Sequence, residues 1–142
     1  MKLKFTSLPT SLVTLTRADG QSIEIPIKAR PAGLTGSIYA AFPRPQPMMQ
    51  STSRGPVEVP VKPAVKQAYS NRLNAILYAS YMPDVVETAR PSFTAGAGVW
   101  SEYGDDLIKE FRRDNWTDDD LAAIGTAAQA LTQQVKREPS GN

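Results

Sequence analysis

The sequence predicts an α+β protein: an N-terminal β-hairpin or small antiparallel sheet, a proline-rich arm, and a C-terminal three-helix bundle. Three observations support this prediction. Short β-branched segments gather in the first third of the 142 residues, six of the twelve prolines lie within residues 43–63, and apolar residues recur at helical spacing after them. We therefore divide the chain into a hairpin region at 1–42, a linker or arm at 43–63, a helical domain at 64–137 and a flexible tail at 138–142.

The first element is a hairpin formed by residues 12–16 and 23–27, which are rich in valine, isoleucine, leucine and threonine. Asp19-Gly20 lies between them, and Asp-Gly is a strong hairpin signal because primed turns need the positive φ that glycine adopts freely. Pro26 has no N–H to donate, so its strand should be an edge or bulged. Alternating lysines and apolar residues at 2–8 indicate a third strand.

The second element is the proline-rich arm at residues 43–63. Proline lacks the N–H that helices and central strands require, so we expect extended, polyproline-like chain here. Such a segment serves as a linker or as a docking arm. Alternatively, the stretch Pro43-Arg44-Pro45-Gln46-Pro47 would bind an aromatic groove of a partner.

Three helices should follow, because apolar residues then recur every three or four positions. The first is expected at 63–82, since proline suits a first helical turn and another proline follows at 83. The second should cover about 100–115. The third should begin after Thr117, an N-cap residue followed by three aspartates where the helix dipole favours anions.

The composition excludes much enzyme chemistry, because the chain contains neither histidine nor cysteine. Catalytic triads, thiol nucleophiles, disulfides and the usual zinc sites all need one or the other. A carboxylate enzyme remains conceivable: Asp114, Asp118, Asp119 and Asp120 would surround Mg²⁺, although helix capping explains the last three more simply. Gly96-Ala97-Gly98 lacks the preceding strand and third glycine of a dinucleotide site. We expect no catalytic activity and no cofactor or metal.

The charges divide unevenly along the chain. Residues 1–90 hold 11 basic and 5 acidic residues, a balance of +6, whereas residues 91–142 hold 5 basic and 9 acidic, a balance of −4. Ordinary solvation explains such a distribution, and head-to-tail association of copies would use it. The basic residues are spread out and rarely interleaved with aromatics, so nucleic-acid binding is not expected. No segment has the apolar length of a membrane span or signal peptide.

Four segments in chain order, residues 12–20, 25–31, 42–45 and 116–135, together resemble the tail assembly chaperones of long-tailed bacteriophages. The resemblance covers most of the chain. It implies a non-enzymatic protein of the host cytoplasm that coats the tape measure protein until tail tube protein polymerises around it. Members of that family are often made in two lengths by ribosomal frameshifting. The implied partners are therefore the tape measure and tail tube proteins, and a second copy or a longer frameshifted form of the chain itself.

A holdase of this kind needs an apolar surface for its partner, and the first two predicted helices offer apolar stripes that could form an amphipathic groove. The alternative is a structural virion protein of the tail, neck or baseplate, whose hairpin adds a strand to a neighbouring subunit. The residues expected to bind the partner are Leu73, Ile76, Leu77, Tyr81, Leu107, Ile108 and Phe111.

Overall fold

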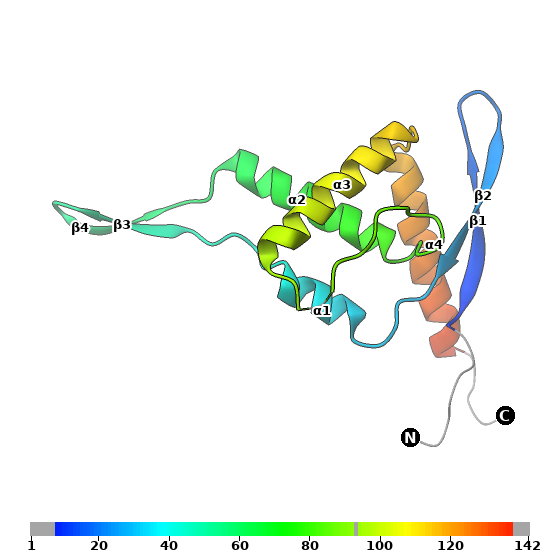
Figure 1. Ribbon diagram of the computed structural model, residues 1–142, viewed down its shortest axis with the longest axis horizontal. Helices are drawn as coiled ribbons and strands as arrows, with labels where there is room; N and C mark the ends of the chain where they lie inside the picture. Colours follow the sequence, from blue (N-terminus) through cyan, green and yellow to red (C-terminus); the bar gives the residue numbers. More distant parts are fainter. Residues whose placement is uncertain (1–7, 93, 138–142) are drawn as a thin grey trace, which may run out of the picture.

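The computed structural model describes residues 8–92 and 94–137, with side chains as far as residue 131. Over this part of the chain the α+β class is confirmed, with two antiparallel two-stranded sheets and four helices (Figure 1). The elements are β1 (Thr10–Thr16), β2 (Ser22–Lys28), α1 (Leu34–Ala41), β3 (Met48–Thr52), β4 (Gly55–Val59), α2 (Pro63–Ala79), α3 (Ala97–Arg113) and α4 (Asp118–Arg137).

The first hairpin is confirmed, with β1 and β2 pairing antiparallel. Its inner face places Leu15, Ile25 and Ile27 in the core. The turn differs from the expected primed turn: Gly20 has a φ of 84°, Asp19 has no positive φ, and the loop closes through the Arg17 N–H donating to the Gln21 carbonyl at 2.7 Å. The third strand expected at residues 2–8 lies almost entirely outside the described residues.

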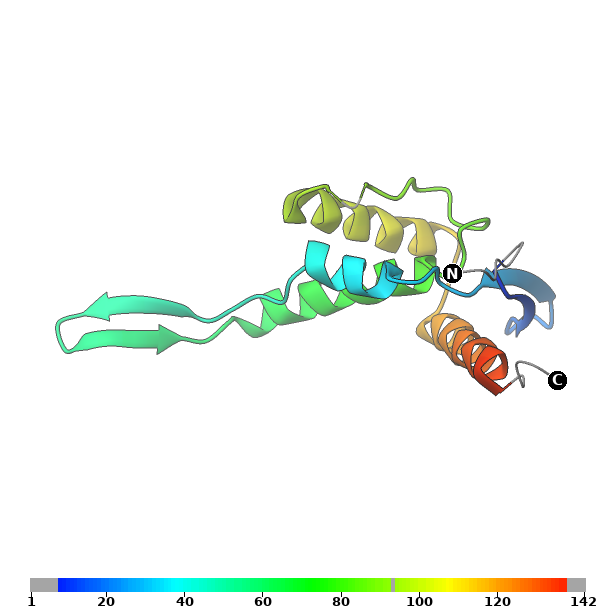
Figure 2. The same ribbon diagram turned by 90° about the horizontal axis from the view of Figure 1, so that it is seen from below.

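The proline-rich arm contains a second hairpin, which corrects the expectation of polyproline-like chain. Strands β3 and β4 pair antiparallel and project away from the helices (Figures 1 and 2). The prolines permit this because Pro47 precedes β3 and Pro60 follows β4, while a two-stranded sheet consists only of edges, where Pro56 is tolerated. The arm is anchored at its base, where the Phe42 ring stacks on the Tyr69 ring with centroids 4.7 Å apart.

Helix α1 was not predicted. It begins after Gly33, whose φ of 83° belongs to the left-handed region and whose lack of a side chain removes the usual capping signal. Leu34 and Ile38 on this helix are buried, as is Phe42 immediately after it. The hairpin region at 1–42 therefore includes a helix that contributes to the core.

The three C-terminal helices are confirmed as helices, but the expected three-helix bundle is not. Helices α2 and α3 pack side by side, whereas α4 contacts mainly β1 and has fewer contacts with α2 (Figure 2). The first hairpin, β1–β2, therefore lies where another helix would pack in a three-helix bundle. One core unites these elements, formed by Leu15, Ile25, Ile27, Leu34, Ile38, Phe42, Ala75, Ile76, Ala79, Met82, Trp100, Tyr103, Leu107, Phe111, Ile124, Ala128 and Leu131.

Candidate partner-binding surfaces

The structure divides the seven predicted partner-binding residues into two groups. Ile76, Leu107 and Phe111 are buried in the chain's own core, and of these three only Phe111 lines the hollow described below. Ile76 and Leu107 lie between α2 and α3, where the apolar stripes of the two helices cover one another instead of forming an open groove in this conformation. The half-buried members pack against the edge of the same core and are Leu73, Leu77, Tyr81 and Ile108.

A hollow of about 460 Å³ lies where α2, α3 and the start of α4 meet. Four half-buried apolar residues line it, one from α2, one from α3, one from the junction between α3 and α4, and one from the beginning of α4: Tyr78, Ile108, Trp116 and Leu121. The buried Ala75 and Phe111 also belong to its lining. Its rim is polar and carries Asn71, Asn74, Arg112 and Asp118. We call this feature the helical hollow. Its size is within the range typical of protein ligand sites.

Trp116 owes its place in the hollow to the sharp junction between α3 and α4. Asn115 has a φ of 60°, the left-handed conformation that ends many helices. The Trp116 N–H donates to the Phe111 carbonyl at 2.9 Å and the Asn115 N–H to that of Arg112 at 3.2 Å, which is the Schellman pattern. The Phe111 and Trp116 rings then meet edge to face at 5.5 Å. The way in which α3 ends therefore places the Trp116 ring in the lining of the hollow.

The start of α4 has the predicted cap in reciprocal form. The Asp120 N–H donates to the Thr117 hydroxyl at 3.1 Å, and the Thr117 N–H donates to the Asp120 carboxylate at 2.9 Å. The same carboxylate pairs with the Arg17 guanidinium at 2.6 Å. Arg17 also donates to the Asn115 carbonyl at 2.7 Å. The first hairpin is thereby fastened to the junction that supports the hollow.

Arg30 fastens the other end of β2 to the end of α2. Its guanidinium donates to the Leu77 carbonyl at 2.7 Å and to the Ser80 hydroxyl at 2.5 Å, and lies 3.9 Å from the centroid of the Tyr81 ring. Burial lowers the pKa of Arg30, and Tyr81 and Tyr39 oppose that shift. The Leu77 carbonyl and the Tyr81 ring, both at predicted partner-binding positions, therefore help to hold β2 against α2.

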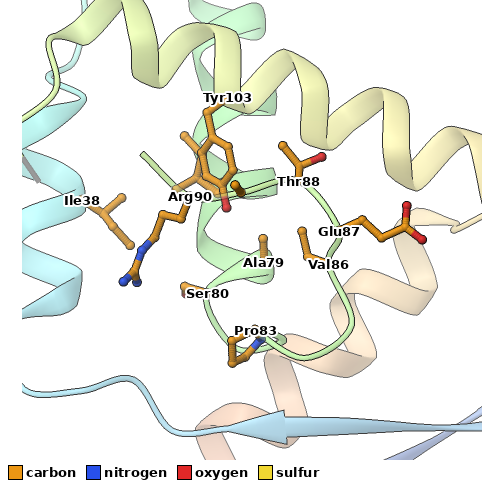
Figure 3. A pocket seen from close by; sticks show the side chains of 11 residues that line it. Ile38, Ala79, Ser80, Pro83, Val86, Glu87, Thr88, Arg90 and Tyr103 are labelled. Carbon is orange, nitrogen blue, oxygen red and sulfur yellow. The ribbon is translucent and has the colours of Figure 1, made fainter. Parts of the chain in front are cut away.

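A smaller pocket of about 280 Å³ lies between α1, α2, α3 and the loop before α3 (Figure 3). The loop is fixed by Glu110, whose buried carboxylate accepts the Glu87 N–H, the Thr88 N–H and the Thr88 hydroxyl at 2.8–3.1 Å. Burial raises the pKa of Tyr103 in the pocket wall to about 12, despite the opposing charge of Arg90. With its carboxylate engaged by three donors, Glu110 has a structural role.

The arm is the second surface, and it exposes large apolar side chains. Met48 and Met49 in β3 are 73% and 65% exposed, and Val57 and Val59 in β4 are 49% and 39% exposed. These residues were not predicted from the sequence, because the prolines around them indicated extended chain without strand pairing. The alternation of Val57, Val59 and Val61 was the signal that could have indicated a strand.

Within residues 8–92 and 94–137, no helix is both long and apolar enough to cross a membrane. In the same residues, carboxylates do not gather in a group of three that could hold a metal ion. Comparisons of the chain with protein-family models, with curated proteins and with solved structures find no match.

Proposed function

We propose that this protein is a non-enzymatic tail assembly chaperone of a long-tailed bacteriophage, which binds the tape measure protein in the host cytoplasm and promotes tail tube assembly. The helical hollow is the observation that supports the proposal. It presents Tyr78, Ile108, Trp116 and Leu121 to solvent between three helices that are fastened in place. The sequence resemblance supplies the identity of the partner.

The chemistry of the hollow suits an amphipathic helix. Such a helix buries residues spaced three and four positions apart in an apolar groove and leaves its polar face at the rim. Asn71 and Asn74 can donate and accept hydrogen bonds there, while Arg112 and Asp118 offer both charges. A long helical partner would then be covered by many copies, each holding a short segment until tail tube protein replaces it.

The test is binding of a purified tape measure segment to the chain and to an Ile108→Asp variant. A carboxylate in the apolar hollow should weaken binding at least tenfold. Val99→Asp is the matched control, because Val99 is also an apolar residue of α3 but is 49% exposed and does not line the hollow. Intrinsic fluorescence can follow binding, since Trp100 is fully buried while Trp116 lines the hollow.

A thermal melt of each variant separates loss of binding from loss of folding. If Ile108→Asp lowers Tm substantially, Leu121→Gln provides a milder change in the same hollow and should also weaken binding. Equal affinity of the control, the parent chain and a folded hollow variant would contradict the proposal that the hollow binds the tape measure protein.

The arm favours a second candidate function, a structural protein of the tail, neck or baseplate. A projecting hairpin with exposed strand edges is suited to docking on a neighbouring subunit. Mass spectrometry of purified mature particles distinguishes the candidates. A structural protein would be present in stoichiometric amounts, whereas a chaperone should have been released.

A further inference from the structure

We infer that the free edge of strand β3 pairs antiparallel with β3 of a second copy of this chain, forming a four-stranded sheet across a two-fold axis. The pairing joins the arms only and leaves the helical hollow of each copy open. It does not depend on the proposed tail function.

The two strands of the arm differ in how their free edges are protected. Strand edges usually carry prolines or charges that prevent unwanted pairing. Strand β4 has both, in Pro56 and Glu58, whereas Met48–Thr52 has neither. The arm therefore has one edge open to strand addition and one that is blocked. Pairing through β3 alone gives a closed dimer and no extended fibre.

The hydrogen-bonding pattern of the arm also leaves β3 ready to pair. Pro56 lies opposite Ser51 and has no N–H, so this position suits a pair of residues that exchange no ladder hydrogen bonds. The N–H and carbonyl groups of Ser51, and by alternation those of Met49, then face the free edge. The residues between them bond inward to β4.

One register uses the whole of β3. With Gln50 opposite its own copy, Met49 faces Ser51 and Met48 faces Thr52, so that the outward groups of Met49 and Ser51 meet as hydrogen-bonded pairs. Pro47 ends the ladder at the same point on both sides. The charges near the strand are compatible with this register. Strand β3 is uncharged, and Arg54 in the turn of one copy would lie opposite the neutral Gln46 of the other.

The four-stranded sheet would stabilise the arm, which as a single two-stranded hairpin is too small to be stable by itself. A two-stranded hairpin alone is marginally stable in water, and three or more strands with an apolar face are needed for independent stability. Met48, Val57 and Val59 share one face of the arm, and pairing would double that face. Because the arms project from the helices (Figures 1 and 2), antiparallel pairing leaves the two helical bodies at opposite ends of the sheet.

Cysteine cross-linking gives a direct test, since the natural chain has no cysteine. In the expected register, Gln50→Cys places one thiol against its own copy at a closely spaced pair, so mild oxidation should give a disulfide-linked dimer. Glu58→Cys on β4 is the control and should remain monomeric. Equal cross-linking at both positions, or none at Gln50, would overturn the inference.

Charge complementation gives a second test that leaves the arm's hairpin intact. In sedimentation equilibrium, the parent chain should shift from monomer to dimer with rising concentration, and the interface is small enough for the dimer to be weak. Gln50→Lys and Gln50→Glu should each lose the dimer through like-charge repulsion, and their mixture should regain it. A parent chain that stays monomeric, or a dimer that survives Gln50→Lys, contradicts β3 pairing. Tape measure protein is absent throughout, so failure here leaves the proposed function unaffected.

Discussion

Replacing Gly104 by alanine should destabilise the protein although alanine is the better helix former. Gly104 lies in α3 close to the backbone of α2, and a Cβ built there would be 2.7 Å from the Arg72 Cβ and 3.1 Å from the Arg72 Cα. The Arg72 Cβ and Cα cannot withdraw by rotating the side chain. The two helices would have to separate, which would also disturb the hollow between them.

The magnitude follows from two opposing effects. Alanine gains up to about 1 kcal/mol over glycine within a helix. Overpacking a close contact typically costs about 1–3 kcal/mol, and the upper half of that range applies because the backbone of α2 is involved. The net expectation for Gly104→Ala is a loss of about 1–2 kcal/mol, or roughly 3–8 °C in Tm for a chain of this length.

The matched control is Gly98→Ala in the same helix. A Cβ at Gly98 meets no atom within 4 Å, so this variant should be neutral or more stable by up to about 1 kcal/mol. Thermal melts and urea titrations followed by circular dichroism measure both changes. If Gly104→Ala proves as stable as Gly98→Ala, the close packing of α2 on α3 described above is incorrect.

Two other predictions concern the cap and a buried phenol. Asp120→Ala should lower the free energy of unfolding by about 2–3 kcal/mol in urea titrations, because Arg17 and the Thr117 N–H both lose a charged acceptor. The control is Asp119→Ala, at an exposed position in the same turn, which should change the free energy of unfolding by less than about 1 kcal/mol. Equal losses in the two variants would refute the role of the cap. The pKa of Tyr103 is raised to about 12 from 10.0, so between these pH values the unfolded chain releases a proton that the folded chain retains. Stability should therefore fall by up to about 1.4 kcal/mol per pH unit over that window and be unaffected by Tyr103 below it. Tyr103→Phe should reduce the alkaline loss measured by urea titration, and an unchanged loss would contradict this.

Local signals made parts of the fold predictable. Asp19-Gly20 between two apolar segments located the first hairpin, and Thr117 followed by three aspartates located the start of α4. Each depends on residues that are neighbours in sequence, so no knowledge of tertiary contacts was needed. Helix α1 lacked such a signal because Gly33 precedes it, and its burial against the core stabilises it instead.

The partner-binding surface was harder to predict, for a physical reason. Helical periodicity identifies which residues share an apolar face but not what covers that face. Ile76 and Leu107 lie on such faces and are covered by the chain's own helices, whereas Ile108, one position further along α3, reaches the hollow. Trp116 lies between α3 and α4, and its place depends on the left-handed turn at Asn115. Only the three-dimensional arrangement brings these residues together.

We propose that the protein keeps a long helical tape measure protein soluble before tail assembly. The most direct measurement is the soluble fraction of the tape measure protein from the same phage. It is compared when the tape measure protein is expressed alone, with this chain, and with the Ile108→Asp variant. We predict that the parent chain raises the soluble fraction and co-purifies with the tape measure protein, and that the variant does so much less. An unchanged soluble fraction with no co-purification would contradict the claim.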